Sequence, residues 1–448
     1  MASRRNFIKK MSAGAAGVAV GSTAMGMSAK SYGKIIGAND KINVAIMGLG
    51  RRLGAFPAPI ARKESNVELK YLCDVMEHQR ERAAGRLAKV LDYKPKLEND
   101  FRKILDDSKV DAIINATPDH WHTPGAIMAM QAGKHVYVEK PCSHNMMENE
   151  MVVKAAEKYG KVVQMGNQQR TSDHTIEIIK EIHNGAIGVP YRAVAFYVNG
   201  RGEVPVQKKA PVPAGLDWEI WQGPAIHREY TEETWNYNWH WYGWNYGTGE
   251  TGNNATHELD VARWALQVAY PNNVHVEAGK RHFFDDGWEM YDTMDATFKF
   301  EGDKVIKWDG RSRSKHDTYA QGGRGTIIFG SEGTVFVDRG KYILYDRMGK
   351  IVRDSISASN EAGTALGGGG DMTTSHVVNW FEGIRGNAKL NAHIAEGAIS
   401  QAMVHYSNVA YRIGHGFDIC DKSGIMFDKD AMKLWGREYD PNWAPKLD

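Results

Sequence analysis

Short apolar runs alternate with longer mixed segments along the first third of the chain. Segments of strand length that are rich in apolar residues cover residues 41–47, 67–73, 112–116, 135–140 and 161–165. The segments between them have the length and composition of helices, over residues 75–91, 101–108, 124–132 and 145–159. Strands and helices that alternate at this spacing predict a doubly wound parallel sheet.

The pattern changes from about residue 166. Alternating apolar and polar positions, typical of half-buried strands, cover residues 191–198, 274–281, 293–300, 305–311, 325–329, 334–337 and 342–345. Several connections between these strands are short and Gly-rich, which favours an antiparallel sheet. Two helices are predicted over residues 372–385 and 392–413, and the Gly-rich residues 367–370 are interpreted as a flexible joint.

The predicted fold class is therefore α/β, with an N-terminal doubly wound parallel sheet (Rossmann type) over residues 40–165. A C-terminal α+β domain with a mostly antiparallel open sheet follows over residues 166–448. The length of 448 residues supports two domains because it exceeds what one core usually organises. The net charge is only +2 and no basic stripe is present, so nucleic-acid binding is not expected.

The first 32 residues are expected to be a targeting segment rather than part of the fold. Paired arginines within residues 3–10 precede a weakly hydrophobic Ala/Gly/Val run over residues 11–27. This pattern resembles a twin-arginine export signal, with a disordered basic N-terminus as the alternative. We therefore expect recognition by the twin-arginine export machinery and a periplasmic or otherwise exported protein. No later stretch is long and apolar enough to span a membrane.

A Gly-rich turn directly follows the first apolar run. It contains Gly48, Leu49, Gly50, Arg51, Arg52 and Gly54. Gly48 would permit a tight turn, Gly50 would let the backbone approach a pyrophosphate at a helix N-terminus, and Gly54 would let that helix lie close to the strand. The turn predicts a dinucleotide site.

Asp74 follows the second predicted strand, where an acidic residue suits the ribose hydroxyls of NAD and repels the 2′-phosphate of NADP. NAD is favoured, but NADP stays open because Arg80 or Arg82 could neutralise that phosphate. The alternative for Asp74 is a helix N-cap, and both roles can hold together.

The ends of the fourth and fifth predicted strands should meet the first two at one edge of the sheet. The residues that follow these strands are Thr117, Pro118, Asp119, His120, Trp121 and His122, then Glu139, Lys140 and Pro141. The carboxyl ends of parallel strands are where α/β folds bind ligands, so all these turns should surround one crevice. A lysine buried there can have its pKa lowered and exchange a proton with a substrate.

Glu139-Lys140-Pro141, the Gly-rich turn and residues 117–122 together resemble the Gfo/Idh/MocA family of oxidoreductases, from about Ile42 to the C-terminus. Residues 217–224 and 375–414 resemble the exported branch of that family. The resemblance implies an NAD(P)-dependent enzyme that oxidises a sugar hydroxyl. It also implies a homo-oligomer formed through the C-terminal sheet.

The family carries a second motif in which an aspartate and a histidine open a helix and, with the lysine, contact the reacting hydroxyl. His257 matches the histidine, whereas Asn253 stands at the aspartate position. An amide can orient a hydroxyl but cannot take up its proton, so Lys140 and His257 are expected to carry the acid–base work. Asn253, Asn254 and Thr256 are expected to contact substrate.

Residues 235–246 hold four Trp and three Tyr mixed with Asn, a composition that suits the apolar faces and hydroxyls of sugars. Trp239 and Tyr242 are therefore predicted substrate contacts, with an aromatic subunit interface as the alternative. Asn167 and Arg170 are further candidates for cofactor and substrate contacts respectively, with structural capping equally open for both.

Metal chemistry is not expected. His120 and His122 form a single i, i+2 pair, and the predicted crevice is already explained by a dinucleotide. Cys73, Cys142 and Cys420 are too far apart for a metal motif or a disulfide framework.

Three functions remain open. The first is an exported NAD(P)-dependent oxidoreductase acting on a sugar or glycoside, with hydride passing to nicotinamide. The second is an NAD-dependent glycosidase that oxidises its sugar transiently; relatives of that kind lack the lysine of Glu-Lys-Pro, whereas Asn253 and Thr256-His257 favour it. The third is a non-catalytic sugar-binding protein on the same scaffold, which predicts damage at the lysine or glycines.

Overall fold

The structure, a computed structural model, describes residues 40–356 and 371–447. The predicted export signal over residues 1–32 and the predicted joint at 367–370 lie outside these ranges. Residues Ile42–Asp448 cluster as one compact unit. Within the described ranges, each helix is too short or too polar to cross a membrane.

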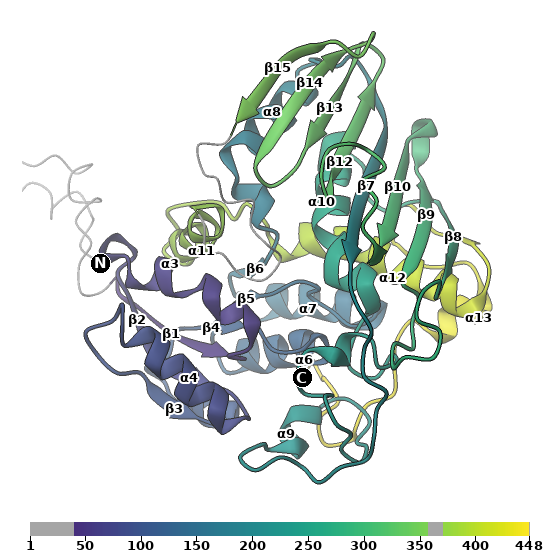
Figure 1. Cartoon of the computed structure of the whole chain (residues 1–448). Helices are drawn as coiled ribbons and strands as arrows, with labels where there is room; N and C mark the ends of the chain where they lie inside the picture. The colour runs from purple at the N-terminus through teal and green to yellow at the C-terminus, as the bar shows by residue number, and fades with distance from the viewer. Residues whose placement is uncertain (1–39, 357–370, 448) are drawn as a thin grey trace, which may run out of the picture. The chain divides into compact units, whose positions relative to one another are not determined.

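The first sheet has six parallel strands, which confirms the predicted doubly wound fold (Figure 1). Its order is β3 (Lys96–Glu98), β2 (Val67–Cys73), β1 (Ile42–Met47), β4 (Ala112–Asn115), β5 (His135–Val138) and β6 (Val163–Met165). The edge strand β3 has only three residues and no buried position, so no hydrophobic pattern marks it in the sequence. The carboxyl ends of β1, β2, β4 and β5 consequently share one edge.

The helices of this domain are α3 (Pro57–Ala61), α4 (Glu77–Leu87), α5 (Phe101–Leu105), α6 (Asp119–Gln131) and α7 (Met146–Lys158). The predicted helices are present, but α4 and α5 end earlier than predicted and α6 begins earlier. Helix α6 starts five residues before the predicted position and contains Pro124. Proline lacks an N–H, so the carbonyl of His120 would lose its helical partner; it accepts instead from Arg437 Nη2 at 2.9 Å.

No long helix follows the Gly-rich turn. The chain forms a 3-10 helix, η2 (Arg51–Ala55), and then the single turn α3, which begins at Pro57. Proline is favoured at the first position of a helix because its missing N–H has no partner there. Gly54 therefore belongs to a 3-10 turn and not to the long helix that the sequence predicts.

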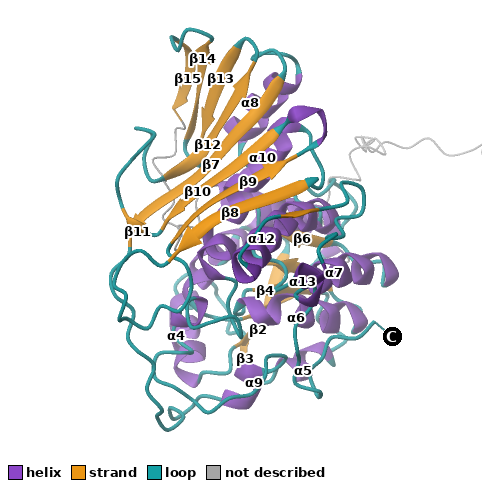
Figure 2. Cartoon of the chain, turned by 90° about the vertical axis from the view of Figure 1, so that its right-hand side faces the viewer, coloured by secondary structure: helices purple, strands orange, loops and turns teal. Residues whose placement is uncertain are grey.

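The second sheet is mixed but mostly antiparallel, as predicted (Figure 2). Its order is β15 (Ile351–Ile356), β14 (Lys341–Asp346), β13 (Gly333–Val337), β12 (Arg324–Gly330), β7 (Pro190–Gly200), β10 (Val305–Arg311), β9 (Thr293–Lys299), β8 (Asn273–Gly279) and β16 (Phe417–Asp418). Strand β11 (Arg313–Ser314) pairs with β7 outside this path. The β7–β10 pair is parallel, and the other pairs are antiparallel.

Helices cover one face of this sheet (Figure 2). They are α8 (Asp173–His183), α10 (Thr256–Leu266) and α12 (Ile394–Ile413). Strand β9 shows the pattern: Met294, Ala296 and Phe298 are buried toward the helices, whereas Asp295 and Lys299 are exposed. The remaining helical pieces are α9 (Trp218–Gln222), α13 (Lys429–Lys433), η3 (Lys63–Ser65), η4 (Gln168–Thr171), η5 (Asn238–His240), the π-helical turn η6 (Thr251–Ala255) and η7 (Glu301–Asp303).

The core of the first sheet includes residues from the C-terminal part of the chain. Helix α11 (Asp371–Ile384) comes from the C-terminal part of the chain, yet Val377, Trp380 and Phe381 are buried in one cluster with β1 and β2. Helix α12 contacts both β6 of the first sheet and β8 of the second. The edge of the first sheet is thereby held against the second domain.

Candidate active site

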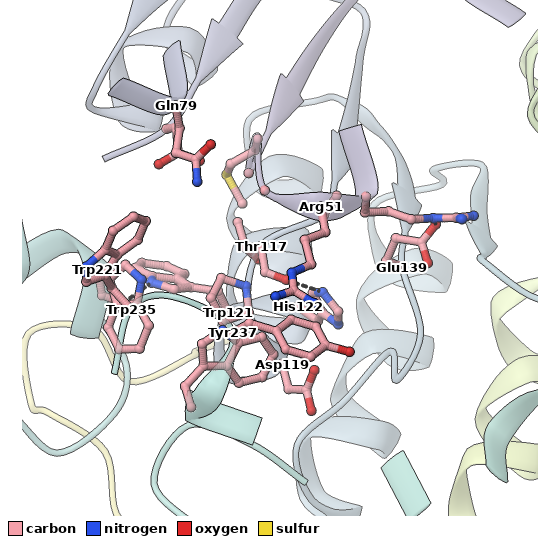
Figure 3. A pocket seen from close by; sticks show the side chains of 18 of the residues that line it. Arg51, Gln79, Thr117, Asp119, Trp121, His122, Glu139, Trp221, Trp235 and Tyr237 are labelled. Carbon is pink, nitrogen blue, oxygen red and sulfur yellow. Dashed lines mark hydrogen bonds and ion pairs between the residues drawn. The ribbon is translucent and has the colours of Figure 1, made fainter. Parts of the chain in front are cut away.

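A cavity lies at the shared edge of β1, β2, β4 and β5, and residues of the second domain form its opposite wall. In Figure 3, Trp221 and Trp235 lie on the opposite side of the view from Glu139, and Tyr237 lies next to Arg51. The predicted residues that line this cavity are Gly48, Gly50, Arg51, Arg52, Asp74, Thr117, Pro118, Asp119, Trp121, His122, Glu139, Lys140, Trp239, Asn253 and His257. The crevice expected from strand order is thus present.

Other predicted residues do not line the cavity. These are Leu49, Gly54, His120, Asn167, Arg170, Tyr242, Asn254 and Thr256. His120 lies behind the cavity wall, with Nε2 2.8 Å from the carbonyl oxygen of Trp221. The Tyr242 hydroxyl donates to the carbonyl oxygen of Pro205 at 2.7 Å, within an aromatic core cluster.

Three of the predicted substrate contacts instead hold the second domain together. Arg170 forms a bidentate ion pair with Asp260, with both N–O distances 2.8 Å. Asn254 donates to Glu250 at 2.9 Å, and the Thr256 hydroxyl donates to Gln401 on α12 at 3.2 Å. Because successive residues of a helix point in different directions, only some positions of the motif can face one cavity.

Lys140 lies where the two domains meet. Its Nζ donates to the backbone carbonyl oxygen of Asn253 at 2.6 Å, and the Lys140–Pro141 peptide is cis. Burial lowers the pKa of Lys140 to about 8, against the raising effects of Asp119 and Glu139. A substantial fraction of the amine is therefore neutral near physiological pH and has a lone pair to accept a proton.

His257 lies in the first turn of α10 and lines the same cavity. Its imidazole hydrogen-bonds to no residue that the structure describes. Burial, followed by the charges of Arg339 and Lys140, holds the pKa of His257 well below its ordinary value. The ring is consequently neutral at physiological pH, and one nitrogen can accept a hydrogen bond from a substrate hydroxyl.

Glu250 was not predicted as a site residue, yet its carboxylate holds the residues around Asn253 together. Its carboxylate accepts hydrogen bonds from Asn253 at 2.9 Å, Trp241 at 3.1 Å and Ser312 at 2.6 Å. Burial alone would raise the pKa of Glu250, but Arg201 and these donors lower it. Its position three residues before Asn253 was the one signal that could have identified it.

Asp119 and Glu139 add negative charge beside Lys140. Asp119 accepts from the hydroxyl and the backbone N–H of Thr248 at 2.6 and 3.2 Å, and burial raises its pKa. Glu139 forms an ion pair with Arg52 at 2.7 Å. Glu139 and Arg52, both predicted cofactor contacts, thus pair with each other at the cavity wall.

The Gly-rich turn after β1 has the form of a dinucleotide-binding turn. Gly48 has φ of +90°, and a Cβ there would lie 2.5 Å from the carbonyl oxygen of Ala116, so only glycine suits this turn. Gly50 also lines the cavity, but a Cβ there would meet nothing within 4 Å. That open space above a Gly-rich turn is where a pyrophosphate can approach the backbone.

Asp74 is placed to contact the ribose of a bound dinucleotide. Its carboxylate accepts from Leu49 N at 2.7 Å and Met76 N at 2.9 Å, so it fixes the Gly-rich turn while lining the cavity. It is not the N-cap of α4, because Met76 holds that position. Carboxylate oxygens have further lone pairs that can accept ribose hydroxyls.

The two arginines that could neutralise the 2′-phosphate of NADP donate hydrogen bonds to nearby backbone carbonyl oxygens. Arg80 Nη1 donates to the carbonyl oxygen of Asp74 at 2.6 Å, and Arg82 Nη2 donates to that of Leu49 at 2.5 Å. NAD therefore remains the favoured cofactor.

Part of the aromatic segment closes the cavity. The Arg51 guanidinium lies 3.9 Å from the centroid of the Tyr237 ring, which connects the Gly-rich turn to the second domain (Figure 3). Trp239 stacks on His240, with ring centroids 3.6 Å apart, and both line the cavity. Trp241 instead stacks on Trp288 in the core. The segment thus divides between a cavity wall and a structural cluster.

This fold and cavity define a two-domain dehydrogenase class, with a dinucleotide domain facing an α/β domain that supplies a histidine. The chain belongs to the Gfo/Idh/MocA oxidoreductase family. Residues 42–167 match "Oxidoreductase family, NAD-binding Rossmann fold", and residues 177–339 match "Oxidoreductase family, C-terminal alpha/beta domain". The predicted family resemblance and NAD-binding domain are confirmed.

The individual relatives share only part of their sequence with this chain. A glycosyl hydrolase family 109 protein of Shewanella baltica (strain OS155) is 29% identical over 211 residues, which are 44% of this chain and 46% of the relative. The chain thus matches about half the length of that relative.

Two solved structures share the fold. The WlbA dehydrogenase of Bordetella pertussis, in complex with NADH and UDP-GlcNAcA, has a TM-score of 0.61 and 20% identity, over 85% of this chain and 99% of that one. A levoglucosan dehydrogenase in complex with NADH and levoglucosan has a TM-score of 0.62 and 18% identity, over 84% and 99%.

Proposed function

We propose that the protein is an NAD-dependent oxidoreductase that oxidises a hydroxyl carbon of a sugar or glycoside. The observation that carries this proposal is the cavity in which Lys140, with a pKa of about 8, lies beside the Gly-rich turn and His257. A binding protein on a decayed scaffold would not need these groups, and Lys140, Gly48 and Gly50 are all intact.

The chain's own residues supply positioning and proton transfer. Bound NAD supplies the hydride acceptor at its nicotinamide ring. The neutral amine of Lys140 accepts the proton of the substrate hydroxyl, while its donated bond to Asn253 O holds it in place. Neutral His257 accepts a hydrogen bond from the same or a neighbouring hydroxyl, and Trp239 offers a flat apolar face to the sugar ring.

The names of relatives support a carbohydrate substrate. The levoglucosan dehydrogenase was solved with levoglucosan, and the WlbA dehydrogenase with UDP-GlcNAcA. Asn-rich and aromatic residues of the second domain, with Asn236, Asn253 and Trp239 at the cavity, suit a polyhydroxylated ligand.

A glycosidase that oxidises its sugar transiently is the second candidate. The match to glycosyl hydrolase family 109 proteins favours it. Asn253, in place of the family aspartate, favours it as well. Lys140 favours plain oxidoreduction, because its amine can accept the proton that the oxidised hydroxyl loses.

One experiment separates these functions. The protein is purified without added nucleotide, its bound dinucleotide is identified by mass spectrometry, and a panel of sugars and aryl glycosides is then added. Reduction of the cofactor without aglycone release is the expected result, and aglycone release without net reduction would identify the glycosidase. Absence of both bound nucleotide and turnover would contradict both functions.

We also infer that the protein is exported after folding around its cofactor, because free NAD is not available outside the cytoplasm. The support is the paired Arg4-Arg5 and the weakly hydrophobic run that follows them. Replacing both arginines with lysine should retain the protein in the cytoplasm with its dinucleotide bound. Unchanged export of that variant would contradict twin-arginine targeting.

A further inference from the structure

Arg339 is a cavity residue that the mechanism above does not use. It lies on the hairpin between β13 and β14. The preceding residue, Asp338, stabilises this turn, because its carboxylate accepts from the backbone N–H groups of Gly340 at 2.7 Å and Lys341 at 2.8 Å. Arg339 is therefore presented to the cavity from a defined turn, and both of these backbone bonds go to Oδ1 of Asp338.

Arg339 has no counter-ion among the residues that the structure describes. The two arginines that act on it electrostatically are both paired: Arg324 binds Glu258 at 2.7 and 2.9 Å, and Arg52 binds Glu139 at 2.7 Å. Within the same described ranges Arg339 makes no hydrogen bond or ion pair, and its buried Nε has no partner. Burial and the charge of Arg324 lower its pKa to about 9.

The position of Arg339 is at the reacting end of the cavity. After burial, its charge is the largest influence that lowers the pKa of His257, and it also acts on Lys140. The ribose-binding residue Asp74 shows no such influence from Arg339 among its main causes. A ligand group that meets Arg339 would consequently belong to the substrate rather than to the adenosine half of the cofactor.

We propose that Arg339 binds an anionic group of the substrate, so that the natural substrate is an acidic sugar carrying a carboxylate or a sulfate ester. This proposal rests on the proposed function and specifies its substrate class. The guanidinium of Arg339 is half-buried, and its buried Nε has no protein partner, which is unfavourable. A carboxylate or a sulfate in the cavity can accept two parallel N–H bonds from it. The neutral sugar counterpart would leave that charge uncompensated.

The test compares matched pairs of neutral and acidic sugars. Methyl glycosides of glucose and galactose are paired with those of glucuronic and galacturonic acid, and galactose 6-sulfate is added as a sulfate probe. The wild type, Arg339→Gln and Arg339→Lys are assayed with retained NAD quantified in each sample. Arg347→Gln is the matched control, since it removes an exposed arginine from the next hairpin of the same sheet.

The wild type should prefer the acidic members by roughly 10-fold or more in kcat/KM, as expected for charge-assisted hydrogen bonds. Arg339→Gln should lose roughly 10- to 100-fold on acidic members and change neutral ones by less than about 3-fold, with Arg339→Lys intermediate. Relative rates on carboxylated and sulfated probes identify the anionic group. Equal effects on both classes, or a preference for neutral sugars, would overturn the proposal.

Failure of the proposed function gives a different result. If the NAD-loaded wild type oxidises no sugar in the panel, that function fails while Arg339 is still tested by binding. Ligand-detected NMR should then show tighter binding of glucuronate than glucose to the wild type and Arg347→Gln. If that preference is absent, or if it persists in Arg339→Gln, the inference is wrong.

Discussion

Two lysines on one strand show how surroundings decide chemistry. Lys134 and Lys140 flank β5 at opposite ends, and burial lowers the pKa of both. Lys134 Nζ donates to the carbonyl oxygen of Asp107 at the far edge of the sheet, away from the cavity. Lys140 instead lies at the carboxyl edge beside His257. A shifted pKa thus marks a candidate base only where a substrate can reach it.

Lys140→Met should retain bound NAD and lose roughly 10³-fold of its reduction by substrate, because general-base catalysis typically contributes 10²- to 10⁴-fold. Retained dinucleotide is measured by mass spectrometry, and its reduction is followed by the absorbance of NADH at about 340 nm. Lys134→Met is the matched control and should keep activity. Wild-type turnover in Lys140→Met would refute the assigned role.

The pH dependence of sugar oxidation should follow Lys140. Since the base must be the neutral amine and its pKa is about 8, kcat/KM should rise as pH increases through about 8 and then level off. His257 should add no step near neutral pH, because its pKa is held well below the ordinary range. A pH profile of the wild type that is flat between pH 7 and 9 would contradict this assignment.

At the scale of elements, the turn between β1 and η2 contains two glycines that differ in backbone conformation and in the space around them. Gly48 needs its positive φ and has the backbone of Ala116 and Thr117 against it. Gly50 has φ of −68°, which any residue can adopt, and it has open space above it. Gly48 is therefore required by the fold, whereas the local backbone and packing do not require glycine at position 50.

Substitution by alanine should distinguish these two positions. Gly48→Ala should lower the free energy of unfolding by at least about 2 kcal/mol, from backbone strain and overlap with the neighbouring strand. Gly50→Ala should change it by less than about 1 kcal/mol but weaken NAD binding roughly 10-fold or more. Chemical denaturation and isothermal titration with NAD measure the two effects, and equal loss of stability in both variants would disprove the distinction.

At the scale of the whole molecule, the dinucleotide domain is not built from the N-terminal sequence alone. Trp380 and Phe381 of α11 are fully buried against β1, β2 and Tyr137 of β5. The site itself needs both domains, because Lys140 follows β5 of the first and Asn253 lies in η6 of the second. Self-association through the open face of the second sheet stays a prediction, which analytical ultracentrifugation can test.

Trp380→Ala should destabilise the protein by about 3–5 kcal/mol, as expected for removing a buried aromatic side chain. The variant should also release NAD at a lower denaturant concentration than the wild type does. The reason is that the space left by the Trp380 side chain lies in the core beneath the first sheet. Phe427→Ala is the control, since that side chain is 67% exposed and should change stability little. An unaltered unfolding midpoint in Trp380→Ala would contradict the shared core.

The sequence by itself determined both sheets, most of their strands and the edge that carries the cavity. Apolar periodicity is local, and the rule that ligands bind at strand carboxyl ends follows from chain order. That reasoning placed Gly50, Asp74, Lys140 and His257 at one site. It also assigned Arg170 and other residues to this site, although the structure pairs Arg170 with Asp260.

Only the tertiary structure decided which side chains of each motif face the cavity and which charges are paired. Asn253 and Asn254 both donate to Glu250 from the π-helical turn, but only Asn253 lines the cavity. Arg339 was not identifiable from sequence, because charged residues at hairpin turns are ordinary. Its significance arises from distant partners: Glu258 and Glu139 are taken by Arg324 and Arg52, and no contact between such residues is encoded locally.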